Sequence, residues 1–394
     1  MKKPSNDTEK LSGFKRYAAN LARKQNLAMF ETLRGSDPSM LRPRLTLGKL
    51  FAYIYSGLFY LIGLAIIFGT FYFIVASHFA ICLSLIGIVL LLVIWVMRPR
   101  FGKYPEKYFT HADIPSLYAV TDDIAREFKI RPVNGITFND DFNATYSRVG
   151  LPRKTLLVMG VPLWNVLDSQ ERIALLAHEL AHGANGDAKR RFFVQTVYDS
   201  LITWVKILYP PRPRNLFDFP SAILLLWLSR FALWNARLLQ YLLSWESRRA
   251  EYLADYLAST IAGTLATRSL LGKLYFGKTL HNIRSSPLRS YVKFDSSAFY
   301  EQVKNTPLEE LERINEPDSE EIARLDLSHP PLGYRMQFLN AKFIAQPKLQ
   351  ISEAQSNNIS GEMNTALQKN QRVHFYDDEF WQNLPKKAGT GKPK

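Results

Sequence analysis

The sequence predicts an α+β protein that is mainly helical, with a small β-sheet and two hydrophobic helical hairpins. Three features indicate this: an uncharged apolar run at residues 51–97, a mixed α/β region after it, and a second apolar stretch at residues 192–245. The chain has 394 residues, which is long enough for one large or two ordinary domains with a sizeable buried core.

The first apolar run predicts a transmembrane helical hairpin. Residues 51–97 contain no Asp, Glu, Lys or Arg, which excludes a wholly soluble protein. As one helix the run would be roughly 70 Å long, about twice the thickness of the hydrocarbon core, so it must fold back. The best break is the A-S-H triplet at residues 76–78, which leaves antiparallel spans at residues 51–75 and 79–97.

The charge of the chain agrees with a membrane protein. Lys and Arg number 50 against 35 Asp and Glu, a formal net charge of +15 that favours an anionic partner. Residues 1–50 carry eleven basic and four acidic side chains, and further basic residues follow residue 97, so the positive-inside rule places both flanks in the cytoplasm. Lipid headgroups are the expected anionic partner, and no motif spacing supports a nucleic-acid partner.

The region after residue 98 predicts a small sheet with helices. Pro115, a favoured first-turn residue, begins a helix that we expect to reach Phe128. Strands are expected at residues 135–138 and 154–159, with an edge strand at residues 143–148.

The next helix begins at Asp168. Asp168 and Glu171 have the spacing of a capping box, in which each side chain accepts the other's backbone N–H. The apolar stripe of this helix consists of Ile173, Leu176, Ala177 and Leu180.

A second helical hairpin is expected at residues 192–245, because two apolar segments flank a Pro-rich link. If the two helices pair antiparallel, Asp199 lies opposite Arg230, and an ion pair would lower the cost of placing both charges in hydrocarbon. A full span would put Arg212 and Arg214 outside, against the charge rule. Spanning and partial immersion therefore stay equally open.

The helix after Asp168 contains the H-E-x-x-H motif, His178-Glu179-Leu180-Ala181-His182. Its spacing places two imidazoles one turn apart on one helix face, where both can bind one metal ion. Glu179 is placed to polarise a water on that ion. The apolar flanks bury the helix, and buried histidines need polar partners, which argues against two solvated histidines. The single cysteine excludes a cysteine-rich metal site.

A catalytic zinc site needs a third protein ligand. The best candidate is Glu251, because Glu251 and Asp255 share a helix face at i and i+4. One acid could bind the metal while the other orients a ligand imidazole. The spacing alone fits a second interpretation equally well, in which Glu251 and Asp255 lie on an exposed charged helix face and pair with Arg248 and Arg249.

Together these motifs resemble the membrane-bound zinc metallopeptidases of the HtpX and CAAX prenyl protease type, within the gluzincins. The resemblance covers roughly residues 115–340. It rests on A-H-E-L-A-H with N-G-D at residues 185–187, E-x-x-x-D at residues 251–255, N-A at residues 143–144, and H-P-P followed by Arg at residues 329–335.

The resemblance implies a zincin-like catalytic domain with one Zn²⁺ per chain. His178, His182 and Glu251 would bind the zinc, Glu179 would act as general base, and Asp255 would support the ligands from behind.

The same resemblance implies further roles in substrate binding and catalysis. Asn143 and Ala144 would bind the substrate backbone, and His329 with Arg335 would stand near the developing oxyanion. The residues alone leave alternatives open, because the two prolines after His329 could simply end a loop and Arg335 could be a surface cation.

The expected function is zinc-dependent hydrolysis of polypeptides, above all membrane proteins, by an HtpX-like endopeptidase embedded in the bilayer. The small number of apolar segments favours this over a CAAX prenyl protease, which encloses its site in a larger helical chamber. Processing of lipidated proteins stays an alternative, as does a non-catalytic membrane scaffold with structural zinc. The oligomeric state stays open.

The expected organisation places a multi-pass protein in the cell or inner membrane, with a cytoplasmic catalytic domain. Its parts are a basic N-terminal tail at residues 1–50, the transmembrane hairpin at residues 51–97, the metallopeptidase domain at residues 98–345 with the hairpin insertion at residues 192–245, and a C-terminal extension at residues 346–394 whose end is disordered.

Overall fold

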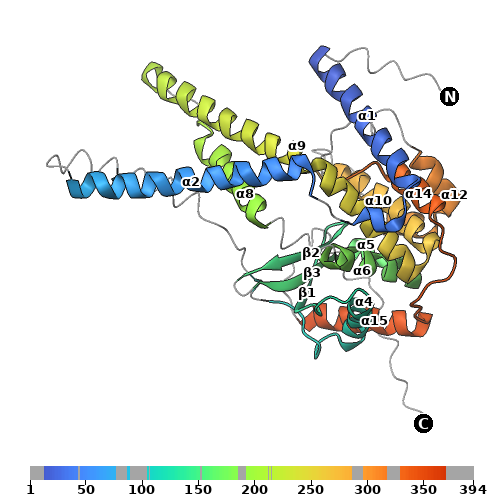
Figure 1. Ribbon diagram of the computed structural model, residues 1–394. Coiled ribbons are helices and arrows are strands. Elements are labelled where there is room, and N and C mark those ends of the chain that lie inside the picture. Colours follow the sequence, from blue (N-terminus) through green and yellow to red (C-terminus); the bar gives the residue numbers. More distant parts are fainter. Residues whose placement is uncertain are drawn as a thin grey trace, which may run out of the picture. The chain divides into compact units, whose positions relative to one another are not determined.

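The computed structural model is mainly helical and contains one three-stranded sheet, which confirms the predicted fold class (Figure 1). It describes residues 13–42, 45–76, 87–88, 104–105, 107–150, 153–184, 192–211, 213, 215–285, 296–316 and 329–369. The chain forms two compact units. The sheet unit comprises Met1–Arg42, Lys103–Gly186 and Arg249–Lys394, and the apolar unit comprises Pro43–Gly102 and Asp187–Arg248.

The sheet has the strand order β1-β3-β2. Its strands are β1 (Gly135–Asn139), β2 (Ala144–Val149) and β3 (Lys154–Gly160). The strand β1 runs parallel to β3, and β2 runs antiparallel to β3, so β2 is an edge strand as the sequence predicts. At the end of β3, Gly160 is needed because a Cβ there would lie 1.7 Å from the carbonyl oxygen of Asp141.

The helices α4 (Pro115–Glu127), α5 (Val161–Val166) and α6 (Ser169–Ala184) share one buried core with the sheet. The predicted capping box at the start of α6 is confirmed. The N–H of Asp168 donates to Oε2 of Glu171 at 2.8 Å, and the N–H of Glu171 donates to Oδ1 of Asp168 at 2.7 Å. All four predicted stripe residues of α6 are buried.

The sheet unit also contains the helices of the C-terminal third. These are α10 (Thr264–Ser285), α11 (Ser296–Asn305), α12 (Leu308–Ile314), α14 (Leu332–Ala341) and α15 (Glu353–Lys369). The helix α15 lies within the predicted C-terminal extension, yet Ile359 and Met363 belong to the main core. Arg172 of α6 donates from Nη1 to the hydroxyls of Ser356 and Ser360, at 2.7 and 3.0 Å. These bonds attach this part of the extension to the start of α6, six residues before His178.

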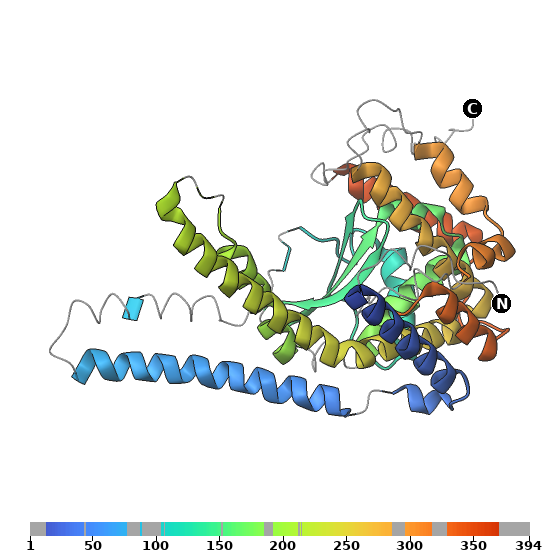
Figure 2. The same ribbon diagram turned by 90° about the horizontal axis from the view of Figure 1, so that it is seen from above.

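The described part of the N-terminal tail forms the helix α1 (Gly13–Arg34) and the short helix η2 (Pro38–Leu41). Figures 1 and 2 both show α1, in dark blue, beside α14. Met29, Phe30, Leu33 and Leu41 are buried, because their spacing gives the segment an apolar face.

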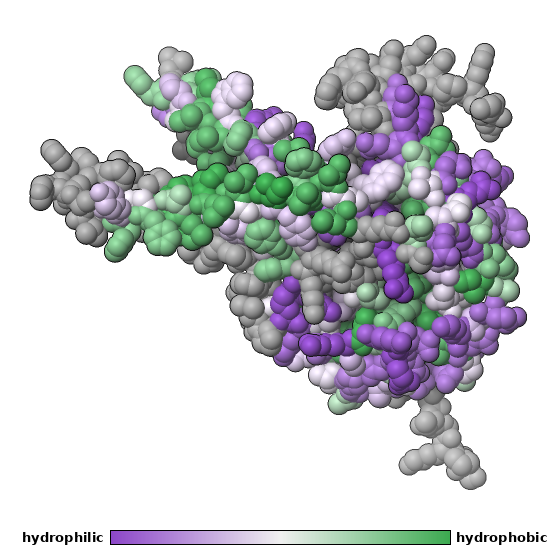
Figure 3. Space-filling view, in the orientation of Figure 1, coloured by the Kyte–Doolittle hydropathy of each residue, from purple (hydrophilic) through white to green (hydrophobic). Residues whose placement is uncertain are grey.

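The apolar unit contains α2 (Leu47–Ala76), α8 (Phe192–Leu208), η3 (Leu216–Asp218) and the first part of α9 (Phe219–Ala262). Within the described residues, two helices are long and apolar enough to cross a membrane, Leu47–Tyr72 and Phe219–Ala262. Figure 3 shows a hydrophobic surface along α2. The predicted second span at residues 79–97 lies outside the described residues, apart from residues 87–88.

The predicted ion pair between Asp199 and Arg230 is wrong. Among the described residues, Oδ1 of Asp199 accepts a bond from Gln195 one turn earlier, at 2.9 Å, and Arg230 is exposed. The register of the hairpin explains the difference. The hydroxyl of Ser229 donates to the carbonyl of Val205 at 3.2 Å, so Asp199 lies about level with residue 235. Arg230 is then roughly 7 Å away along the helix axis.

Candidate metal centre

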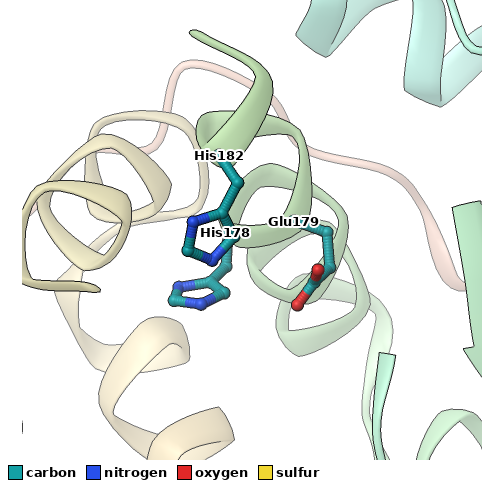
Figure 4. Close-up of side chains that lie close together, drawn as sticks. All are labelled: His178, Glu179 and His182. Atoms are coloured by element: carbon teal, nitrogen blue, oxygen red, sulfur yellow. The ribbon is translucent and has the colours of Figure 1, made fainter. Parts of the chain in front are cut away.

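The histidines of the H-E-x-x-H motif lie together on one face of α6. The ring centroids of His178 and His182 are 5.0 Å apart, with the ring planes nearly perpendicular. Figure 4 shows both rings on the same side of the helix and the carboxylate of Glu179 beside them. One ligand atom from each of these three residues lies within 4.8 Å of the other two. The local helical spacing therefore brings three potential ligands to one point.

The last turns of α9 supply two acids to the same place. Glu251 and Asp255 are both buried, with 6% and 0% of their surface exposed, which rules out an exposed charged face. Nε2 of His178 lies 3.7 Å from Oε2 of Glu251, and Nε2 of His182 lies 3.7 Å from Oε1. These separations are too long for hydrogen bonds. The carboxylate thus faces both imidazoles across a small gap.

The donor set and its spacing fit a zinc ion. Two imidazole nitrogens and one carboxylate oxygen form a ligand set found in catalytic zinc sites. Ligand bonds of about 2.0–2.2 Å in a tetrahedral arrangement separate the ligand atoms by about 3.3 Å, within a few tenths of an ångström of the distances to Glu251. Glu179 is also within reach, but its Oε2 accepts the backbone N–H of Tyr146 at 2.9 Å. The geometry therefore favours Glu251 over Glu179 as the candidate third ligand.

Arg335 of α14 lies behind these ligands. Its Nε and Nη2 each donate to one oxygen of Asp255 at 2.7 Å, and Nη2 lies 3.3 Å from Oε2 of Glu251. Oδ1 of Asp255 in turn lies 3.1 Å from Nδ1 of His178. Only 3% of Arg335 is exposed, so its guanidinium is paired with the two buried carboxylates and not with solvent. This ion-pair network connects α14 and α9 with the first histidine.

His329 reaches the site from the segment just before α14. Its Nδ1 lies 3.2 Å from Oε2 of Glu251, and 58% of its side chain is exposed. His329 is therefore the open, solvent-facing imidazole of the cluster, whereas Arg335 is enclosed. The structure brings both residues next to Glu251.

The predicted substrate-binding pair lies at the start of β2. The carbonyl of Asn143 accepts the N–H of Gly160 at 2.8 Å, the side chain of Asn143 is exposed, and Ala144 is buried. None of the contacts found among the described residues joins Asn143 or Ala144 to the two histidines. The N-G-D triplet at residues 185–187 lies outside the described residues.

Tyr146 is a strand residue that contacts the motif, and no sequence motif pointed to it. Its backbone N–H holds Glu179, and its ring lies against Gly183, where a Cβ would be only 2.9 Å from Cζ of the ring. Strand alternation offers the signal, because Tyr146 shares a face with Ala144.

Burial dominates the electrostatics of the motif. It raises the pKa of Glu179 to about 7, and Glu251 adds to the rise, while His178, the N–H of Tyr146 and His329 oppose it. Burial lowers the pKa of His178, but Asp255 and Glu251 outweigh it and leave that pKa above its usual value. A carboxyl with a pKa near 7 can both accept and release a proton near neutral pH.

Comparison with known proteins identifies the family of the chain. Residues 112–342 match the family described as Peptidase family M48. No curated protein and no solved structure matches the chain. The matched region covers more than half of the chain and includes the histidine motif, both acids of α9, His329 and Arg335. The chain therefore belongs to peptidase family M48, whose members are metal-dependent peptidases.

Proposed function

We propose that this protein is a membrane-bound zinc endopeptidase that cleaves polypeptides in the quality control of membrane proteins, in the manner of HtpX. One observation carries the proposal: a buried carboxylate, that of Glu251, lies 3.7 Å from each of two imidazoles on a neighbouring helix. Membership of a metallopeptidase family supports the reaction class.

The proposed chemistry divides between the metal and Glu179. When bound by His178, His182 and Glu251, zinc supplies the Lewis acidity that activates a water and polarises the scissile carbonyl. Glu179 takes the proton from the attacking water and then passes it to the leaving amine. The N–H of Tyr146 holds one oxygen of Glu179 and so orients the carboxylate for this transfer.

The edge strand β2 is the proposed platform for the substrate. The N–H of Tyr146 points away from β3, because it donates to Glu179. In an antiparallel strand the backbone groups of Ala144 and Arg148 then face the same way, toward the open edge. An extended peptide can add as a strand beside β2, and backbone hydrogen bonds tolerate many sequences. Such tolerance suits quality control.

His329 and Arg335 have different proposed roles. His329 is exposed beside Glu251 and is the group proposed to stabilise the oxyanion. Arg335 is buried against two acids, so we propose that it positions Glu251 and Asp255.

The proposed location is the cell or inner membrane. Two long apolar helices support membrane attachment, and the basic residues around the first apolar run support a multi-pass topology with the catalytic domain in the cytoplasm.

The test is proteolysis of unfolded casein by the full-length protein in detergent, measured together with zinc content. We expect Glu179→Gln to lower kcat by about 10²–10⁴-fold and to keep one zinc per chain, because only the base is lost. Glu309→Gln, which changes an exposed carboxylate on α12, is the matched control and should keep full activity. Full activity in Glu179→Gln would contradict the mechanism.

Two other outcomes would redirect the proposal. A wild-type protein that holds zinc but cleaves nothing is a scaffold with structural zinc. Cleavage that requires a lipidated cysteine near the substrate C-terminus indicates processing of prenylated proteins, which a comparison of casein with a prenylated peptide detects.

A further inference from the structure

The segment that precedes the first apolar helix packs on the sheet unit through a buried face. We name residues 29–42 the N-terminal brace. The ring of Phe30 stacks on that of Tyr334 in α14, with centroids 5.0 Å apart and planes within 15°. Both residues are buried. The brace lies outside the region matched by the family, residues 112–342.

The backbone of the brace is also held by two cations of the sheet unit. Nζ of Lys342 donates to the carbonyl of Ser36, and Nη2 of Arg249 donates to the carbonyls of Met40 and Arg42, the latter at 2.8 Å. Bonds from charged donors are stronger than neutral ones, and Arg249 is itself buried. The brace is therefore held at three places: at Phe30 on α1, at Ser36 after that helix, and at Met40 and Arg42 at its end.

Two of the three attachment residues lie close in the sequence to a residue of the metal centre. Tyr334 directly precedes Arg335, and Arg249 lies two residues before Glu251. Arg335 in turn binds both oxygens of Asp255 and approaches Glu251. The brace thus contacts α14, which carries Arg335, and α9, which carries Glu251 and Asp255.

We infer that the N-terminal brace positions the metal ligands. Phe30 is a positioning residue that acts through Tyr334. The stacked rings hold α14 in the position in which Arg335 contacts Asp255 and Glu251. Groups that orient metal ligands commonly change metal affinity by 10–100-fold when they are removed. The inference rests on the proposed function, since it concerns how firmly the zinc ligands are held.

The experiment compares Phe30→Ala, Phe30→Tyr and Ile359→Ala in the full-length protein in detergent. Ile359→Ala is the matched control, because it removes a buried side chain from α15, which packs on α4 and bonds to α6 at Arg172, six residues before His178. Three quantities are measured: the zinc Kd by competition with a chelator, kcat and KM on casein, and the unfolding temperature of the zinc-free protein.

Phe30→Ala should weaken zinc binding about tenfold and lower kcat with little change in KM. Phe30→Tyr keeps the stacked ring and should behave as wild type. Ile359→Ala should lower the unfolding temperature at least as much as Phe30→Ala and leave the zinc Kd unchanged.

Two results would overturn the inference: an unchanged zinc Kd in Phe30→Ala, as for a tail that only binds lipid headgroups, or an equal loss in Ile359→Ala. If Phe30→Ala does not fold, Phe30→Leu removes the stacking and keeps most of the volume. Failure of the proposed function is seen separately in the wild type. Zinc binding without proteolysis leaves the Kd comparison valid, and no zinc binding overturns both.

Discussion

The two helices that supply the proposed ligands, α6 and α9, encode their chemistry differently. On α6, three functional side chains lie within about one turn, on a helix that begins with its own capping box. On α9, Glu251 and Asp255 lie near the end of a long helix whose first half is apolar. Their partners, His178 and Arg335, come from two other helices. The proposed metal centre therefore combines a local motif on α6 with tertiary contacts made by the acids of α9.

This difference predicts which property each helix controls. The acids of α9 are buried and face the imidazoles, so changes there should act mainly on metal retention. Around Glu179, the structure places Tyr146 and the tight contact at Gly183, so changes there should act mainly on the reaction. Substitutions on the two helices test that division.

Glu251→Ala should weaken zinc binding by more than about 100-fold, because it removes a ligand, a larger loss than that of an orienting group. Chelator competition measures the Kd, and thermal unfolding checks that Arg335, which keeps Asp255 but loses Glu251, does not unfold the chain. Retention of zinc in this variant, with loss in Glu179→Gln, would show that Glu179 is the third ligand instead.

Asp255→Asn should weaken zinc binding by about 10–100-fold, because the neutral amide no longer balances Arg335 or orients the ring of His178. The matched control is Asp123→Asn, which changes an exposed acid paired with Arg126 on α4. An equal zinc Kd in the two variants would contradict a role for Asp255 in zinc binding.

Gly183→Ala should lower proteolysis severalfold and destabilise the protein by about 1–3 kcal/mol, because the new Cβ meets the ring of Tyr146. Zinc content should stay at the wild-type level. The double variant with Tyr146→Leu should recover stability if the clash is the cause. Gly361→Ala is the control, since its Cβ would meet nothing within 4 Å.

Asp168→Ala should have the smallest effect, a loss of about 1 kcal/mol in the free energy of unfolding, because it removes the N-cap of α6. Chemical denaturation in detergent measures it. A large loss of zinc affinity in this variant would mean that the motif depends on the helix start more than its local spacing suggests.

Several features could be predicted from the sequence because they depend on near neighbours in the chain. The capping box at Asp168, the start of α4 at Pro115 and the strand positions follow from spacing and backbone preference. The ion pair between Asp199 and Arg230 failed for the opposite reason. That prediction depended on the register of the hairpin, which changes with the residue at which each helix meets the Pro-rich link. A shift of one helical turn is enough to separate the two charges.

The contacts of the brace and of α15 also join segments far apart in the sequence, so local patterns do not predict them. Composition places residues 29–42 in a basic tail at residues 1–50, although this stretch itself carries two basic and two acidic side chains. Their buried face becomes visible only when Tyr334 and Arg249, about 200 residues or more away, are placed against it.

Patterns within the sequence were enough to predict the first apolar helix, the helix that presents two imidazoles on one face, and the glutamate beside them, since a helix repeats every 3.6 residues whatever surrounds it. Three further contacts depend on how the chain folds: Glu251 faces those imidazoles, Arg335 is enclosed behind it, and Tyr146 holds Glu179. These contacts join segments far apart in the chain, and their free energy depends on burial and distance, which no local pattern contains.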